Sequence, residues 1–214
     1  ISDDTQMTLF TANGLLYGIT RFCMRGIGSD LFNYVAMAYD EWLQTQMELP
    51  LEDEWHTCWI RNISALNSRR APGNTCLSAL TALREQKAVS NNSKGCGGVM
   101  RAAPIGLLSG VARGKETIDI ACDCAAITHK HPLGYLPAGM LACIIRDIVD
   151  CSEDLTEITF EEIVRNASTA LLTDFNGDSY AIELGRTIST AMELAKGDGA
   201  DYNNIRIIGE GWTG

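Results

Sequence analysis

The sequence predicts an all-α protein, folded as a single globular domain with an orthogonal arrangement of helices. Apolar residues recur at helical spacing almost throughout the 214 residues, and convincing strand alternation is absent. Hydrophobic residues make up 46% of the chain, which is enough for one sizeable core. Neither a repeat nor a linker divides residues 1–214, so we expect one domain.

The first third of the chain is expected to hold three helices. One face of the first helix is marked by Met7, Phe10, Leu15, Ile19 and Phe22. The second helix is marked by Leu31, Tyr34, Val35, Ala38 and Trp42. The turn at 71–75 ends in residues typical of a helix N-cap, so a third helix should run from about Cys76 to Glu85.

The polar, glycine-rich stretch 86–98 is expected to be a loop. Helices should follow near 99–112, 115–129, 132–150, 159–172 and 179–196, with Pro132 suited to a first turn. Residues 204–208 are the one doubtful piece, where the pattern does not decide between helix and strand.

The net charge of −10 argues against sequence-independent binding to nucleic acid and against an anionic membrane surface, because both depend on Lys and Arg. No stretch reaches about 18 uncharged apolar residues, so we expect no transmembrane helix. The eight cysteines form no Cys-x-x-Cys motif and lie mostly in apolar helical patterns. We therefore expect free thiols and a cytoplasmic protein.

Ser2-Asp3-Asp4-Thr5 is the first motif that could carry chemistry. Two adjacent carboxylates and a hydroxyl are hard oxygen ligands of the kind that magnesium or manganese prefers. The same residues are also ordinary helix capping, a Ser N-cap followed by acids in the first turn. Taken alone, the motif favours capping.

The second motif is the loop Asn91-Asn92-Ser93-Lys94-Gly95-Cys96-Gly97-Gly98, which leads into a helix start. Glycines before a helix N-terminus allow backbone N–H groups to approach an anion closely. The stretch is neither a Walker loop nor a dinucleotide fingerprint, because Gly-Lys-Ser/Thr and a preceding strand are missing. A flexible surface loop and a phosphate-binding loop both remain open.

The third motif, Thr128-His129-Lys130-His131, combines two histidines at a helix junction. Such histidines can bind metal or a ligand, although a structural hydrogen bond is the more common role. A fourth stretch, 174–178, resembles a calcium loop, but Ser179 and Gly185 stand where an EF-hand needs Gly and Glu. We reject it as an EF-hand.

The order of these motifs is more specific than any one of them. Ser-Asp-Asp-Thr-Gln at 2–6 is followed by Arg-Ala-Pro-Gly-Asn-Thr at 70–75, by Ser-Lys-Gly-Cys-Gly-Gly-Val-Met-Arg-Ala-Ala-Pro at 93–104, and by Thr128-His129. This series resembles the ADP-ribosylglycohydrolase family, which includes the dinitrogenase reductase-activating glycohydrolase and the ADP-ribosyl-acceptor hydrolases. The resemblance runs over most of the chain.

The resemblance implies a hydrolase that cleaves the glycosidic bond between ADP-ribose and a protein side chain or a small acceptor, at a two-metal centre of magnesium or manganese. Ser2, Asp3 and Asp4 would ligate one ion, and the two acids would be catalytic. The other residues implied to bind substrate are Asn92, Ser93, Lys94, Gly95, Cys96, Gly97 and His129. Arg101 is expected to be structural, paired with a nearby acid or carbonyl.

One departure concerns the second metal motif of the family, Asp-x-Asp-Ser/Thr, because no such string occurs in this sequence. Ile1 is not an initiator Met, and Thr213 looks like an N-cap without its helix. We therefore expect a domain that is incomplete at both ends and inactive in isolation. We also expect the two ends of the chain to lie close together beside the Gly95–Gly98 loop, which would place Ile1 near that loop and His129.

Two other functions remain open at this point. The chain could be a non-catalytic nucleotide-binding or structural relative of the family. It could also be a carboxylate-metal phosphohydrolase of another all-α fold, although such enzymes use several His ligands and only His56, His129 and His131 are available.

Overall fold

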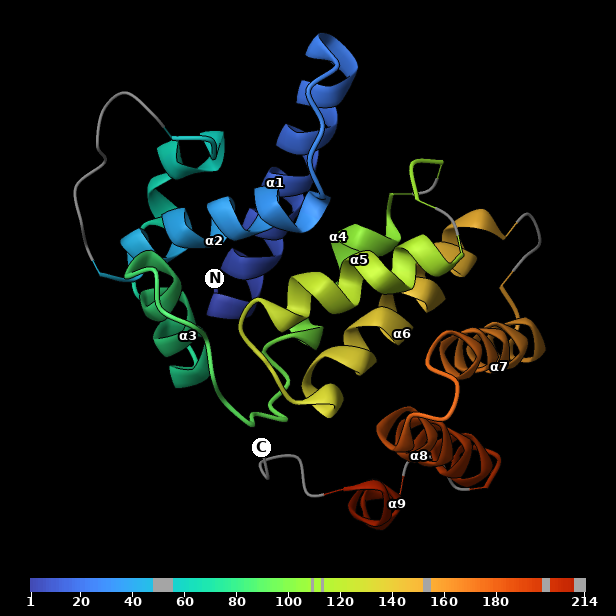
Figure 1. The fold of residues 1–214 in the computed structure, drawn as a ribbon. Coiled ribbons are helices and arrows are strands. Elements are labelled where there is room, and N and C mark those ends of the chain that lie inside the picture. Colours follow the sequence, from blue (N-terminus) through green and yellow to red (C-terminus); the bar gives the residue numbers. More distant parts are fainter. Residues whose placement is uncertain (48–55, 109, 113, 152–154, 198–200, 210–214) are drawn as a thin grey trace.

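The structure is a computed structural model that describes residues 1–47, 56–108, 110–112, 114–151, 155–197 and 201–209 (Figure 1). Every regular element in these ranges is a helix, which confirms the all-α prediction. The α-helices are α1 (Asp3–Arg25), α2 (Leu31–Gln46), α3 (Asn74–Arg84), α4 (Ala103–Gly106), α5 (Lys115–Ala126), α6 (Pro132–Asp150), α7 (Glu157–Asp174), α8 (Ser179–Ala195) and α9 (Tyr202–Ile208). The 3-10 turns are η1 (Trp59–Asn62), η2 (Ser64–Leu66) and η3 (Val99–Arg101).

Helix α1 buries most of its predicted apolar face, but the last predicted residue of that face is exposed. Met7, Phe10 and Leu15 are fully buried against α2, whereas Phe22 is 62% exposed. The last turns of α1 project beyond the body of the molecule (Figure 1), so the helical pattern continues where no partner covers it. The helix ends at Gly26, whose φ of 63° is the left-handed conformation that favours glycine.

The prediction of a long helix near 99–112 is wrong, because the chain forms only η3 and the four-residue α4 there. Pro104 has no N–H to donate to the carbonyl of Met100, four residues earlier. That carbonyl instead accepts a hydrogen bond from Thr8 Oγ1 of α1 at 3.1 Å. Farther on, Gly110 has a φ of 86°, which ends any helical continuation.

Smaller corrections concern two other segments. The doubtful residues 204–208 are helical and belong to α9, whose N-cap is Asp201. The Asp201 carboxylate accepts a hydrogen bond from the N–H of Asn203 at 2.9 Å. Helix α3 starts two residues earlier than predicted, at Asn74, and the 3-10 turns η1 and η2 were not predicted. Thr213 lies outside the described residues.

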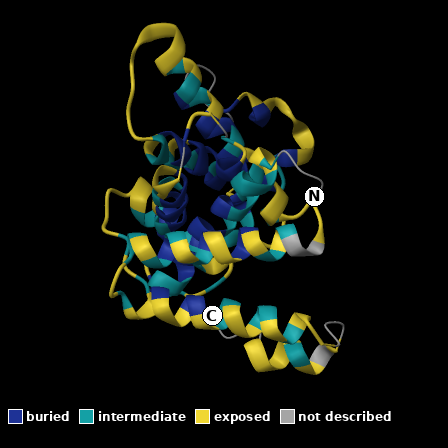
Figure 2. Cartoon of the chain, turned by 90° about the vertical axis from the view of Figure 1, so that its right-hand side faces the viewer, coloured by how far each residue is buried: buried dark blue, intermediate teal, exposed yellow. Residues whose placement is uncertain are grey.

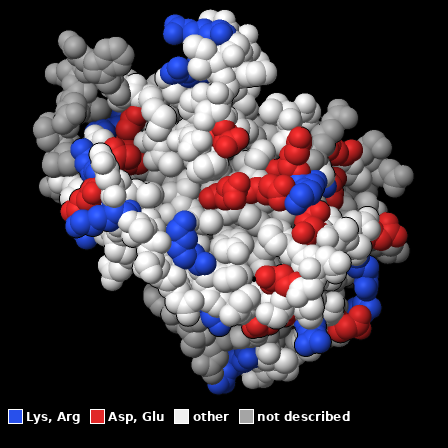
Figure 3. Space-filling model, in the orientation of Figure 1, with Lys and Arg blue, Asp and Glu red and all other residues white. Residues whose placement is uncertain are grey.

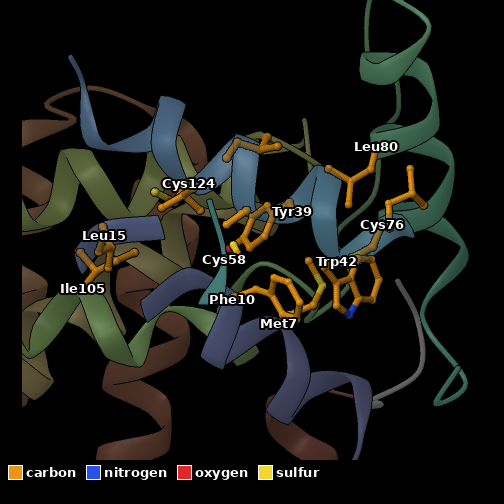
Figure 4. Close-up of a cluster of buried hydrophobic side chains, with 14 of the residues drawn as sticks. Met7, Phe10, Leu15, Tyr39, Trp42, Cys58, Cys76, Leu80, Ile105 and Cys124 are labelled. Atoms are coloured by element: carbon orange, nitrogen blue, oxygen red, sulfur yellow. The ribbon is translucent and has the colours of Figure 1, made fainter. Parts of the chain in front are cut away.

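Two large clusters of buried side chains and a small one of Ala102, Ala125 and Ala138 form the interior of the described residues. The first joins α1, α2, α3 and α5 around residues such as Phe10, Tyr39, Trp42 and Cys76 (Figure 4). The second lies between α5, α6, α7 and α8. Because α5 and α6 border both clusters, they hold the two halves of the molecule together, while α8 and α9 form an exposed edge (Figure 2).

By length and composition alone, one described helix, α6, is apolar enough to cross a membrane. It packs against α4, α5, α7 and α8. A helix that packs against several others is apolar for that reason. The eight cysteines are free thiols, and most of those in helices are buried, as predicted.

Acidic side chains gather over α5 (Figure 3). They line an open groove of about 370 Å³ between the start of α2 and α5, and include Asp30, Glu116, Asp119 and Asp123. Burial, and then the charges of Asp119 and Asp30, raise the pKa of Asp123. A nucleic acid phosphate would be repelled from this face.

Candidate functional site

The acid pair stands at the first turn of α1. Ser2 Oγ accepts a hydrogen bond from the N–H of Thr5 at 3.3 Å, so Ser2 is the N-cap of the helix. Asp4 is exposed, while Asp3 is half-buried near the backbone N–H of Gly73, which favours the charged form of its carboxyl group. Burial, and then the charge of Asp4, raise the pKa of Asp3. A bound cation would offset both effects, so capping does not exclude a ligand role.

The first turn of α3 lies between the acid pair and the glycine loop. The negative charge of Asp3 reaches this turn, where it helps to raise the pKa of the buried Cys76 thiol, although burial is the larger cause. On the other side, Thr75 Oγ1 donates a hydrogen bond to Ser93 Oγ at 3.2 Å. The N-terminal segment and the glycine loop therefore approach the same turn.

Asn91 anchors the start of the loop to the junction between α5 and α6. Its Nδ2 donates to the carbonyl of Thr128 at 2.8 Å. Its Oδ1 accepts from the N–H of Ser93 and from the N–H of Lys130, each at 3.2 Å. Ser93 Oγ in turn accepts from the N–H of Gly95 at 3.3 Å. These bonds give the loop a defined shape, which argues against an unstructured surface loop.

Glycines occur where the loop is too crowded for a side chain. A Cβ built on Gly97 would stand 2.7 Å from His129 Cε1 and 3.2 Å from Cys76 Sγ. One on Gly98 would stand 2.6 Å from the carbonyl oxygen of Gly134, and one on Gly134 would stand 2.5 Å from the carbonyl oxygen of Ser93. The loop is therefore packed directly on the α5–α6 junction without intervening side chains.

Arg101 lies fully buried beneath this junction, at the end of η3. Its Nη2 donates to Thr128 Oγ1 at 2.6 Å and lies 3.4 Å from the carbonyl oxygen of Cys124. Its guanidinium carbon stands 4.4 Å from the centre of the Tyr39 ring. The predicted carbonyl partner is confirmed, while no Asp or Glu of the described residues forms an ion pair with Arg101. Its charge is therefore available to attract an anion.

His129 lies between Arg101 and the glycine loop and is only 2% exposed. Its Nδ1 is 2.9 Å from Thr128 Oγ1. Burial, and secondarily the charge of Arg101, lower the pKa of His129 to about 4. The ring is therefore neutral at physiological pH, where it can donate one hydrogen bond and accept another.

A family model for ADP-ribosylglycohydrolase matches residues 1–214. The chain belongs to the ADP-ribosylglycohydrolase family. Comparison with curated proteins and with solved structures gave no match. The acid pair, the glycine loop and His129 all lie within the range that the family model covers.

The structure brings together part of the ADP-ribosylglycohydrolase site that the sequence predicts. Gly95 and Gly97 lie against His129, and Ser93 is joined to them by the hydrogen bond from the N–H of Gly95. The charge of Asp3 acts on Cys76 in the first turn of α3. Asn92, Lys94 and Cys96 are exposed on the loop, and the Cys96 carbonyl accepts the N–H of Val99 at 2.9 Å where η3 begins. Their roles toward a ligand stay predictions.

Other candidate ligands are engaged elsewhere. His131 Nδ1 accepts from the N–H of Leu133 at 3.0 Å, so this ring caps α6. His56 is exposed, before η1. Asp178, from the rejected calcium loop, caps α8. A phosphohydrolase site built on the three histidines therefore has no support in this structure.

The residues that fix the shape of the site were harder to predict than those expected to bind a ligand. Asn91 and Thr128 lie within the predicted motifs, whereas Cys76 and Gly134 carry no ligand signal in the sequence. All four act on the loop or on His129 rather than on a substrate. Gly134 was the one most open to prediction, because a glycine inside a helix needs a packing reason.

The donor set at Ser2, Asp3 and Asp4 fits part of a metal centre. Carboxylate and hydroxyl oxygens suit magnesium or manganese, and one or two carboxylates are enough for an ion that keeps several waters. Within the part of the chain that the structure describes, no three His, Cys, Asp or Glu side chains form a metal-binding group. The acid pair would supply one set of ligands, and the second motif of the family, Asp-x-Asp-Ser/Thr, does not occur in this sequence.

Proposed function

We propose that this chain binds ADP-ribose and belongs to a hydrolase that cleaves the glycosidic bond between ADP-ribose and a protein side chain or small acceptor. The observation that carries the proposal is the glycine loop, packed on the neutral His129 above the buried Arg101, in a chain of the ADP-ribosylglycohydrolase family.

The loop supplies the chemistry that a diphosphate needs. Backbone N–H groups of 95–97 can approach an anion, that of Gly95 by exchanging its long bond to Ser93 Oγ for one to a phosphate oxygen. The Arg101 guanidinium lies below them, buried and without a carboxylate partner among the described residues, so it adds a positive potential that little water screens. Lys94 is exposed on the loop and adds a mobile positive charge at its outer side.

Ser2, Asp3 and Asp4 are the residues that would hold a magnesium or manganese ion. When bound, such an ion polarises a water molecule and holds the ribose hydroxyls near the bond to be cleaved. Residues 91–97 and His129 then orient the substrate, because binding energy at the diphosphate positions the distant ribose. The reaction itself passes through an oxocarbenium-like state at the anomeric carbon.

The alternative is a non-catalytic relative, which would bind ADP-ribose at the glycine loop without cleaving the glycosidic bond. The experiment uses the purified protein that contains residues 1–214. Calorimetry measures its affinity for ADP-ribose, AMP and ribose 5-phosphate with magnesium or manganese. Release of ADP-ribose from ADP-ribosyl-arginine and ADP-ribosyl-serine peptides measures turnover.

The three outcomes are distinct. Binding of ADP-ribose that is tighter than binding of AMP, together with metal-dependent release, supports the hydrolase. Binding without release from any conjugate favours the non-catalytic relative. Failure to bind ADP-ribose overturns both.

A further inference from the structure

A buried row of three polar side chains runs from η3 to the glycine loop. Arg101 Nη2 lies 2.6 Å from Thr128 Oγ1, and Thr128 Oγ1 lies 2.9 Å from His129 Nδ1. All three side chains are at most 2% exposed. In a buried network of this kind each proton has a defined position, because leaving a polar atom without a hydrogen bond there costs free energy.

The direction of these bonds follows from the donors available. An arginine has only N–H donors, so Thr128 Oγ1 is the acceptor of the bond from Arg101. The Thr128 hydroxyl still has its own proton to donate. Among the described residues, His129 Nδ1 is the nitrogen or oxygen atom placed to accept it. The Cys76 sulfur, which also contacts Thr128, is a weaker acceptor and stays a thiol because burial raises its pKa.

The ring proton of His129 then stands on Nε2, which faces the loop. A Cβ built on Gly97 would lie 3.0 Å from Nε2, and one on Gly95 would lie 3.6 Å from it. The Nε2–H therefore points to the inner side of the same segment whose backbone N–H groups are proposed to bind the diphosphate.

The groups around the ring keep it uncharged. Arg101 faces it from η3, Cys76 from α3, and Gly95 and Gly97 from the loop. Burial and Arg101 both disfavour the imidazolium, and no carboxylate contributes to the lowered pKa.

We propose that Arg101 and Thr128 are positioning residues that fix His129 as an Nε2–H hydrogen-bond donor directed at the bound nucleotide diphosphate. The identity of the acceptor rests on the proposed function, whereas the tautomer does not. A neutral donor of fixed direction adds specificity for an anionic oxygen, and Arg101 supplies the charge without approaching the ligand.

The test is nitrogen NMR of the ¹⁵N-histidine-labelled protein, with the His129 signals assigned from a His129→Gln spectrum. We expect an unprotonated Nδ1 and a protonated Nε2 in the unmodified protein at pH 7. Protonation on Nδ1 would overturn the proposal without any variant.

Thr128→Val removes the hydroxyl at nearly constant shape, and Thr128→Ser keeps it. The valine variant should give a mixture of tautomers and bind ADP-ribose about tenfold more weakly, the scale of one hydrogen bond to a charged group. The serine variant should keep the tautomer and bind within about twofold of the unmodified protein. An unchanged tautomer in a folded valine variant would contradict the positioning role.

The two proposals fail separately. An Nε2–H tautomer in a protein that does not bind ADP-ribose removes the proposed function and leaves the role of Arg101 and Thr128 in place. Binding of ADP-ribose by a protein whose His129 carries its proton on Nδ1 supports the proposed function and removes the role of Arg101 and Thr128. If Thr128→Val does not fold, the unmodified protein and the serine variant still decide the tautomer.

Discussion

The packing of Gly97 against His129 gives a quantitative prediction. In a Gly97→Ala variant the new Cβ would meet His129 Cε1 at 2.7 Å, Nε2 at 3.0 Å and Cys76 Sγ at 3.2 Å. The ring cannot swing away easily, because it is buried and bonded to Thr128. At Gly95, by contrast, the nearest atoms to a new Cβ are Ser93 Oγ at 3.4 Å and His129 Nε2 at 3.6 Å, which are ordinary contacts.

Overpacking a well-filled site costs about 1–3 kcal/mol, from which the lower chain entropy of alanine in the unfolded state subtracts up to about 1 kcal/mol. We therefore expect Gly97→Ala to lower the free energy of unfolding by about 1–2 kcal/mol. That loss corresponds to a fall in Tm of about 2–8 °C for a domain of this size. Gly95→Ala, the matched control in the same loop, should stay within about 0.5 kcal/mol.

The assay is urea unfolding of both variants followed by far-ultraviolet circular dichroism, with equal m-values required for the comparison. ADP-ribose binding is measured in parallel, and the bulkier Gly97→Val should weaken it by about 1–3 kcal/mol. A Gly97→Ala variant as stable as the unmodified protein would refute the packing argument. So would a larger loss from Gly95→Ala.

Three further predictions follow from other parts of the site. Asp4→Asn should abolish metal-dependent turnover of the full-length enzyme with the helical circular dichroism intact, and turnover retained at saturating magnesium would return Asp4 to a capping role. The pKa of His129 is about 4 in the folded protein and about 6.5 when unfolded, so its contribution to stability is complete above pH 6.5 and is lost as the pH falls toward 4. A His129→Gln variant should lack this loss of about 3 kcal/mol, and equal acid slopes in unfolding experiments would contradict the lowered pKa. Asn91→Ala removes three hydrogen bonds that anchor the loop, so proteolysis within 91–98 should accelerate while cleavage in other exposed loops stays unchanged.

The sequence predicted most of the fold because its helices carry strong apolar periodicity. It failed where a local feature outweighed that periodicity. The stretch near 99–112 reads as helical, yet Pro104 and Gly110 interrupt it, and Thr8 takes the carbonyl that the helix would have used. The pattern also placed Phe22 in the core, because periodicity does not show where a neighbouring helix ends.

The candidate site was predictable only where residue types carry a chemical signal. Paired acids, clustered glycines and a histidine stand out in a sequence, and these residues do approach a common turn of the structure. The network that shapes them does not stand out. Thr128 and Asn91 are ordinary polar residues whose importance comes from three-dimensional contacts across 27 and 37 residues of chain, with Arg101 and with the Thr128 carbonyl respectively.

The most direct test of the account is a crystal structure of the full-length protein with ADP-ribose. We expect the diphosphate within hydrogen-bonding distance of the backbone N–H groups of 95–97, with His129 Nε2 donating to one of its oxygens and the ribose on the side of Asp3 and Asp4. An ADP-ribose bound away from this loop, or a diphosphate that does not contact it, would contradict the central claim.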